Sequence, residues 1–400
     1  MEISLTRMNT IKHMETPVTG SQRPQRTRLW TNNIWLICLS HLLLSTSLYM
    51  LIPTLPVWLV VRYGANSFEI GGILALSGLV AFMLGPFFNY LVDRFPRKSV
   101  CAWGLLGVAA CSLGFYWVPV LGWVVALRVV QGMLQGVALM ASGSTLAIDL
   151  TTSPHRTDVN NAFAWFGRLG LSVGPLMGLL VQYLFGFHNV FIASFVIGML
   201  ACLCVLCLKV PFRAPLCPPK FSLDRFWLPN GWLMFLQTIP VAAVTGILLG
   251  TIHRYEFYVF IMVGFCLALL ALHFVFLNAD IRSEIVSGNI LWAAGLLLLI
   301  FREGTPAFYA SSILIGMGIG LTVARLLVFF IKLSHHCERG SANTSYMFAW
   351  ELGIGLGLFL GYTVFPDPLE SYWVCLWILA GALVFYLLLT HRWFMAHKVR

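Results

Sequence analysis

Four charged side chains lie well inside long apolar segments of this 400-residue chain, where an unpaired charge is costly. Glu351 and Arg168 each lie about ten residues into an apolar segment, and Arg128 and Arg325 lie in two others. A charged side chain near the middle of a bilayer costs about a few kcal/mol unless it is paired or faces a cavity. We therefore predict that these side chains face a cavity, one another or a bound molecule.

Glu351 is the carboxylate that the sequence places near the middle of a membrane. A carboxyl group in this position can bind a proton or a cationic group of a substrate, and Arg168 and Arg128 would adjust its affinity. The alternative is structural, with Glu351 and an arginine in an ion pair that locks two helices. Three arginines against one glutamate also permit an anionic or zwitterionic substrate, so the sequence leaves the charge of the substrate open.

Further candidate binding residues are uncharged polar side chains on apolar segments. Gln131 and Gln135 follow Arg128 on its own segment, His41 lies in the first apolar segment, and Gln237 lies in the seventh. His41 could transfer protons, although a histidine paired with a neighbouring hydroxyl is the more frequent arrangement. Gln237 could equally pack between helices.

The two segments that carry Arg168 and Glu351 are copies of one pattern. The chain reads RTDVNNAFAWFGRLGLSVGPLMG at 156–178 and RGSANTSYMFAWELGIGLGLFLG at 339–361, which is 183 positions later and in the same direction. Such a repeat predicts two parallel halves. Both copies carry small residues every four positions, a spacing that admits a neighbouring helix: Gly170, Gly174 and Gly178 with Pro175 in the first, and Gly353, Gly357 and Gly361 in the second.

The composition predicts an all-α membrane protein. The chain is 59% hydrophobic and 10% charged, and its mean hydropathy is +0.85. Twelve apolar segments are long enough to span a bilayer, and they lack the alternation of barrel strands. We expect a cytoplasmic tail at 1–29, a six-helix bundle at 30–210, a cytoplasmic linker at 211–229, a second bundle at 230–392 and a cytoplasmic tail at 393–400.

The positive charges predict the orientation of these helices. If both termini are cytoplasmic, 19 of the 25 lysines and arginines fall in cytoplasmic segments. The net charge of +10 is therefore a topology signal and does not indicate nucleic-acid binding. We expect a monomeric, multi-pass protein of the plasma membrane, in a bacterium the inner membrane. His335, His336 and Cys337 make a poor zinc site, so we expect no metal and no cofactor.

The loop after the second apolar segment reads NYLVDRFPRKSV at 89–100. It resembles the signature Gly-x-x-x-Asp-Arg-x-Gly-Arg-Lys of the major facilitator superfamily, with Asn89 and Pro96 in place of the glycines. The resemblance implies a gating loop whose carboxylate rests against the N-terminal end of helix 11 and holds the outward-facing state. The residues on its charged positions are Asp93, Arg94, Arg97 and Lys98.

Two further motifs resemble the same family. Arg128, Gln131 and Gly132 match an Arg-x-x-Gln-Gly motif on helix 4, which implies proton coupling with an acidic residue on helix 1 that this chain lacks. The glycines at 170, 174 and 178 with Pro175 resemble the helix 5 motif of antiporters, although Leu179 replaces its last glycine.

The resemblance implies a 12-helix, multidrug-efflux-like member and secondary active transport of a small molecule. We expect proton-coupled export of amphipathic compounds by alternating access, with a site lined by helices 1, 4, 7 and 10. One alternative is an uptake symporter or facilitator for a nutrient or an anionic metabolite. Another is a membrane-embedded transferase, for which Asp149 and His155 are among few loop-borne candidates, so we do not expect an enzyme. The expected partners are a small-molecule substrate, the lipid bilayer and protons.

Overall fold

The computed structural model describes most of the chain after the N-terminal tail. The tail to residue 28, part of the expected linker and His336 lie outside the described residues. The described ranges are 29–152, 155–211, 219–277, 279–335 and 337–399.

The described residues form helices and contain no strand, which confirms the all-α prediction. Before the linker they are α1 (Asn32–Tyr49), α2 (Leu55–Tyr63), α3 (Ser67–Arg94), α4 (Arg97–Gly114), α5 (Leu121–Leu139), the π-helix η1 (Met140–Leu146), α6 (Ala147–Asp149), α7 (Arg156–Phe185) and α8 (Phe187–Leu206). After it they are η3 (Pro229–Gly231), α9 (Trp232–Thr251), α10 (Tyr255–Phe274), α11 (Ile281–Phe301), α12 (Thr305–Leu333), α13 (Arg339–Thr363), α14 (Pro368–Phe385), the π-helix η4 (Tyr386–Thr390) and α15 (His391–His397).

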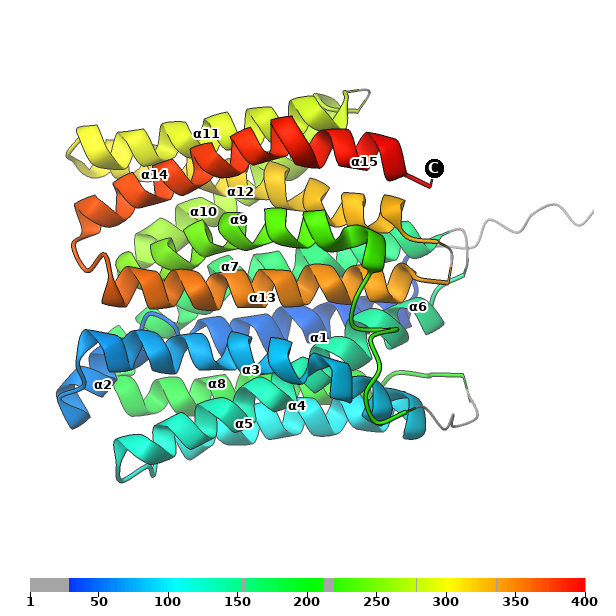
Figure 1. The fold of residues 1–400 in the computed structure, drawn as a ribbon. Coiled ribbons are helices and arrows are strands. Elements are labelled where there is room, and N and C mark those ends of the chain that lie inside the picture. The colour runs from blue at the N-terminus through cyan, green and yellow to red at the C-terminus, as the bar shows by residue number, and fades with distance from the viewer. Residues whose placement is uncertain (1–28, 153–154, 212–218, 278, 336, 400) are drawn as a thin grey trace, which may run out of the picture.

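The long helices lie side by side along one direction (Figure 1). Among the described residues, nine helical segments are long and apolar enough to cross a membrane. Helices α1, α4 and α13 lie within the same bundle and are long enough, but they are not among these nine because they carry more polar residues. The count of twelve spans therefore stays a prediction.

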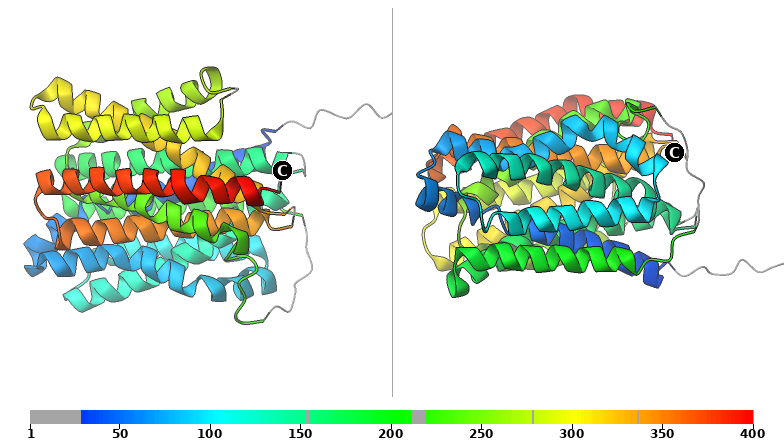
Figure 2. Two further views of the ribbon diagram at one scale, coloured as in Figure 1. Left: turned by 45° about the horizontal axis from the view of Figure 1, so that its top comes forward. Right: turned by 90° about the horizontal axis from the view of Figure 1, so that it is seen from below.

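The helices pack in two groups on either side of the linker in the sequence. In the first group α1 packs against α7 and α8, and α4 packs against α5 and α8. In the second, α9 packs against α13 and α14, and α11 packs against α12 and α14. The groups meet where α3 contacts α13 and where α7 contacts α10. Helix α1 begins, and the chain ends, at the end of the bundle where the described part of the linker lies (Figure 2).

The repeated glycines lie at equivalent helix contacts in the two groups. On α7, Gly170, Gly174 and Gly178 face the backbone of α1, and a side chain at these positions would collide with residues from Leu42 to Met50. On α13, Gly353 and Gly357 face α9 in the same way, and Gly361 lies opposite Ile247. The repeated glycines therefore pack α7 on α1 and α13 on α9, the first long helix of each group. This contact fixes the rotation of α7 and α13, and with it the direction of Arg168 and Glu351.

Candidate functional site

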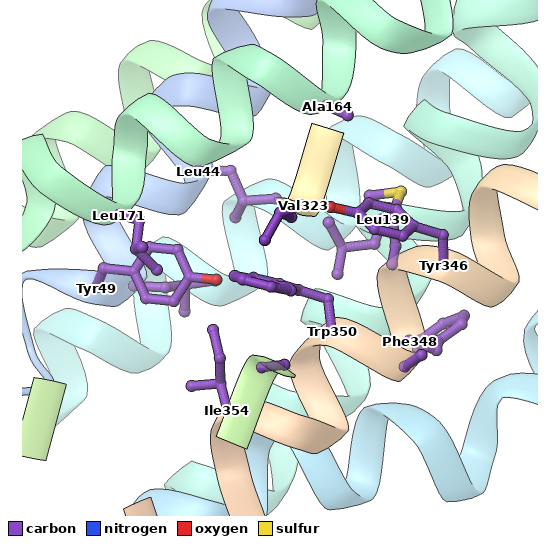
Figure 3. Packing of buried hydrophobic residues seen from close by; sticks show 14 of the residues in the cluster. Leu44, Tyr49, Leu139, Ala164, Leu171, Val323, Tyr346, Phe348, Trp350 and Ile354 are labelled. Carbon is purple, nitrogen blue, oxygen red and sulfur yellow. The ribbon is translucent and has the colours of Figure 1, made fainter. Parts of the chain in front are cut away.

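A cavity of about 30 Å³ lies between α1, α5, α7 and α13. Its polar lining includes His41 from α1, Arg168 from α7 and Glu351 from α13. Figure 3 shows the ring of Trp350 between those of Tyr49 and Tyr346 beside this space. This volume has room for at most a few water molecules, so the cavity is too small for a substrate-sized molecule in this conformation. No residue of α9 or α12 lines the cavity, although the resemblance implied lining by helices 7 and 10, which correspond to α9 and α12.

Glu351 connects the two groups of helices. It is partly buried. The hydroxyl of Tyr49 on α1 donates to its Oε1 at 3.1 Å, and Nε2 of Gln135 on α5 donates to its Oε2 at 2.8 Å. Each carboxylate oxygen on α13 thus accepts a hydrogen bond from an uncharged donor on the opposite group.

Arg168 lies on the same cavity and is 4% exposed. Its Nη2 donates to the carbonyl oxygen of Val323 at 3.0 Å and to the hydroxyl of Tyr346 at 3.2 Å. Its guanidinium carbon lies 5.0 Å from the ring centroid of Trp165. Within the described part of the chain, Nε and Nη1 have no hydrogen-bond partner. Arg168 and Glu351 do not form the structural ion pair that we considered from the sequence.

His41 faces the cavity but pairs with the backbone. Its Nδ1 lies 2.9 Å from the carbonyl oxygen of Phe163, and since a carbonyl only accepts, Nδ1 carries the proton. The imidazole stacks on the ring of Phe163 at 4.0 Å, in a space that Gly167 leaves open. The sequence favoured a hydroxyl partner, and the observed partner is a carbonyl.

Arg128 and Gln131 lie away from the cavity. Nη1 of Arg128 donates to Oε1 of Gln131 at 2.8 Å, and Nε2 of Gln131 donates to Oγ of Ser112 on α4 at 3.1 Å. Both side chains are buried. Gln135, which lies one turn further along α5 and outside the motif, is the glutamine that contacts Glu351. These contacts do not place Arg128 beside Glu351, although the sequence suggested that it adjusts the affinity of that carboxylate.

Arg325 forms an ion pair with Glu284 of α11 and does not line the cavity. Sequence reasoning missed Glu284 because the apolar run of this segment begins only at residue 286, whereas helix α11 begins at Ile281. Asp280, at the N-cap position of α11, is of a residue type common there and was the available signal for the earlier start.

Gln237 is a packing residue in this structure. Its Nε2 donates to the carbonyl oxygen of Ala382 on α14 at 3.0 Å, and its Oε1 accepts from the hydroxyl of Thr390 at 3.1 Å. These bonds tie α9 to α14 and to the π-helix η4 that follows it. This is the interhelical alternative that the sequence left open.

The charged loop between α3 and α4 forms an ion network. Asp93 accepts from Arg97 at 3.2 Å and from Arg225 of the linker at 2.8 Å. Arg97 also donates to Asp149 at 2.5 Å. Lys98 donates to a backbone carbonyl at 2.8 Å, and the guanidinium of the remaining loop residue, Arg94, lies 5.9 Å from the ring centroid of Tyr90.

The linker, and not Asp93 itself, reaches α13. The hydroxyl of Ser341 donates to the carbonyl oxygen of Asp224, and that of Ser345 donates to the carbonyl oxygen of Phe226 at 3.0 Å. The backbone N–H of Leu228 in turn donates to Ser345 at 2.8 Å. The connection between α3 and the start of α13 therefore runs through the linker, in contrast to the direct contact that the family resemblance implied.

Comparison with known proteins agrees with this architecture. The family model described as Major Facilitator Superfamily matches residues 37–279. The multi-drug resistance efflux pump PmrA of Streptococcus pneumoniae serotype 4 is 22% identical over 182 residues, which cover 44% of this chain and 45% of the pump. The staphyloferrin B transporter of Staphylococcus aureus is 25% identical over 179 residues, which cover 44% of this chain and 42% of that protein. The chain thus spans less than half the length of these curated relatives.

Two solved structures share the fold along most of the chain. The nucleoside transporter NupG superposes with a TM-score of 0.62 at 15% identity, and the match covers 92% of this chain and 99% of that transporter. The human organic anion transporter MFSD10 (TETRAN) superposes with a TM-score of 0.66 at 14% identity, with 88% and 98% covered.

Proposed function

Because the chain belongs to the major facilitator superfamily, we propose that it is a membrane transporter of a small molecule, not an enzyme, and that it works by alternating access. The halves at 30–210 and 230–392 rock against each other around the cavity between α1, α5, α7 and α13. Binding and release of a proton at Glu351 drive export of an amphipathic substrate. The protein acts as a monomer in the bacterial inner membrane, with both termini in the cytoplasm.

The observation that carries this proposal is the position of Glu351 across the interface between the halves. Its carboxylate belongs to α13, and its two donors, Tyr49 and Gln135, belong to the other half. Hydrogen bonds to an ionised acceptor are roughly twice as strong as those between neutral groups. Protonation of Glu351 therefore weakens the contact of α13 with α1 and α5. A proton that binds the two conformations with different affinity shifts the equilibrium between them.

Export rather than uptake is supported by the efflux pump among the relatives and by the glycines of α7, which resemble the antiporter motif. The aromatic rings of Tyr49, Tyr346 and Trp350 beside the cavity suit an amphipathic substrate. The proposal also includes a gate, in which the ion pair of Asp93 with Arg225 of the linker holds the cytoplasmic ends of the two halves together.

The test is exchange in proteoliposomes. Purified protein is first screened by thermal shift against lipophilic cations, sugars, peptides and organic anions, because a ligand that binds only the folded state raises the melting temperature. Uptake of the best ligand is then measured with and without an imposed pH gradient. We expect Glu351→Gln to lose the response to the gradient and to keep exchange of labelled for unlabelled ligand without one.

Glu303→Gln is the matched control, because Glu303 is an exposed carboxylate on the loop between α11 and α12. It should respond to the gradient as the wild type does. Gradient-driven uptake by Glu351→Gln at the wild-type rate would contradict the proposed role of Glu351.

A further inference from the structure

Arg168 is buried with part of its hydrogen-bonding capacity unused. A guanidinium has five N–H groups, of which Nε carries one and Nη1 carries two. Nη2 is occupied by Val323 and Tyr346, while Nε and Nη1 have no partner among the described residues. A buried donor without an acceptor costs about 1–3 kcal/mol, and more when it is charged. An anionic group entering the cavity would remove this cost.

Glu351 does not supply that anion. Both its oxygens are held by Tyr49 and Gln135, and no nitrogen of Arg168 lies within the 4.0 Å of an ion pair. Each charge is instead held by uncharged groups of the opposite helix group, Glu351 by α1 and α5 and Arg168 by α12 and α13. The other two intramembrane arginines contact groups elsewhere, Arg128 on α5 and Arg325 on α11. The cavity therefore presents one cation and one anion that are kept apart.

We infer that the substrate is a zwitterion, whose anionic group binds the free N–H groups of Arg168 and whose cationic group binds the carboxylate of Glu351. This inference rests on the proposed function. The aromatic rings of Tyr49, Tyr346 and Trp350 contact the apolar part of the molecule. The cationic group and the proton compete for Glu351, so loading of substrate releases the proton, as an exchange cycle requires.

A substrate with a single charge satisfies this site less well. An anion gains the N–H groups of Arg168 but is repelled by ionised Glu351 on the same cavity. A cation gains Glu351 but leaves the donors of Arg168 without an acceptor and is repelled by the guanidinium. A zwitterion avoids both costs.

The experiment compares matched ligands by calorimetric titration of the purified full-length protein in detergent at neutral pH. One series places the charges across a ring: 4-(aminomethyl)benzoate, 4-methylbenzoate, 4-methylbenzylamine and neutral 4-methylbenzamide. The second places them on neighbouring atoms: L-phenylalanine, 3-phenylpropionate, phenethylamine and neutral 3-phenylpropanamide. We expect the zwitterion of at least one series to bind about tenfold or more tightly than each of its singly charged analogues. A singly charged analogue that equals its zwitterion, or no binding of either zwitterion, would overturn the inference.

Substitutions assign each charge to its residue. Arg168→Gln should reduce the affinity for the zwitterion to that for the amine, and Glu351→Gln should reduce it to that for the carboxylate. Arg168→Lys, which keeps the charge, should restore part of the loss, and Arg302→Gln, at an exposed position, should change nothing. Retained binding of the singly charged analogue shows that each variant is folded. A loss of preference in Arg302→Gln equal to that in Arg168→Gln would also overturn the assignment.

These titrations use no gradient, so they separate the inference from the proposed function. If Glu351→Gln still responds to a pH gradient while the zwitterion preference holds, the proton role fails and the substrate class stands. If exchange depends on Glu351 but singly charged analogues bind as tightly as the zwitterions, only the inference about the substrate class fails.

Discussion

The hydrogen bond from Tyr49 to Glu351 should be worth more than an ordinary hydrogen bond inside a membrane protein. Tyr49→Phe removes the donor that lies 3.1 Å from Oε1 and keeps the ring, which is 5% exposed. A hydrogen bond to a charged group contributes about 1.5–3 kcal/mol to stability. Hydrogen bonds between helices in a membrane average about 0.6 kcal/mol. The substitution should therefore lower the free energy of unfolding by about 1.5–3 kcal/mol.

A double-mutant cycle isolates this interaction. In a Glu351→Gln background the acceptor is an uncharged amide, so Tyr49→Phe should cost only about 0.5–1.5 kcal/mol, and the coupling between the two substitutions should be about 1 kcal/mol or more. The free energy of unfolding of the wild type, the two single variants and the double variant is measured by reversible unfolding in mixed detergent micelles. Tyr183→Phe removes a hydroxyl from a side chain that is 80% exposed and serves as the control, with no measurable effect expected. An equal cost of Tyr49→Phe in both backgrounds would refute the reasoning.

Two further substitutions test the parts of the fold that position the cavity. Arg225→Gln removes the 2.8 Å contact with Asp93, and because Arg225 is 27% exposed, the substitution should lower the free energy of unfolding by no more than about 1 kcal/mol. It should also speed thiol labelling of cysteines introduced at the cytoplasmic ends of α3 and α13. Unchanged labelling would exclude a closing role for the linker. Gly357→Val places a side chain against the backbone of Ala243 and should lower the melting temperature strongly or prevent folding. The control is Gly381→Val, which has open space around it and should change the free energy of unfolding by at most about 0.5 kcal/mol. Similar effects of the two substitutions in thermal unfolding would contradict the packing role of the repeated glycines.

Several features of the site could be anticipated because they depend on composition and spacing. The apolar content and length of the segments predicted membrane helices, since a helix satisfies its own backbone in lipid. The repeat predicted that Arg168 and Glu351 occupy equivalent positions, and both line one cavity. The signal for Glu284 was weaker, because it lies in the first turn of α11, where composition does not separate helix from loop.

The roles of the three arginines could not be separated in the same way. Arg128, Arg168 and Arg325 each lie within a long apolar segment, and their sequence surroundings do not show which side chains they contact. In the structure Arg128 pairs with an amide and Arg325 with a glutamate, while Arg168 lines the cavity and has two nitrogens without a hydrogen-bond partner among the described residues. The side chains that decide these outcomes come from other helices, so local sequence carries no record of them.

The sequence by itself determined that the chain forms membrane helices, that the segments at 156–178 and 339–361 repeat one pattern, and which few charged groups enter the apolar region. Those properties follow from local hydrophobicity and from spacing along the chain. Only the tertiary structure decided that Glu351 meets Tyr49, from which it is separated by 302 positions, and that it does not meet Arg168. The physical reason is that such contacts depend on the rotation and packing of helices, which the glycine contacts with α1 and α9 fix after the helices have formed.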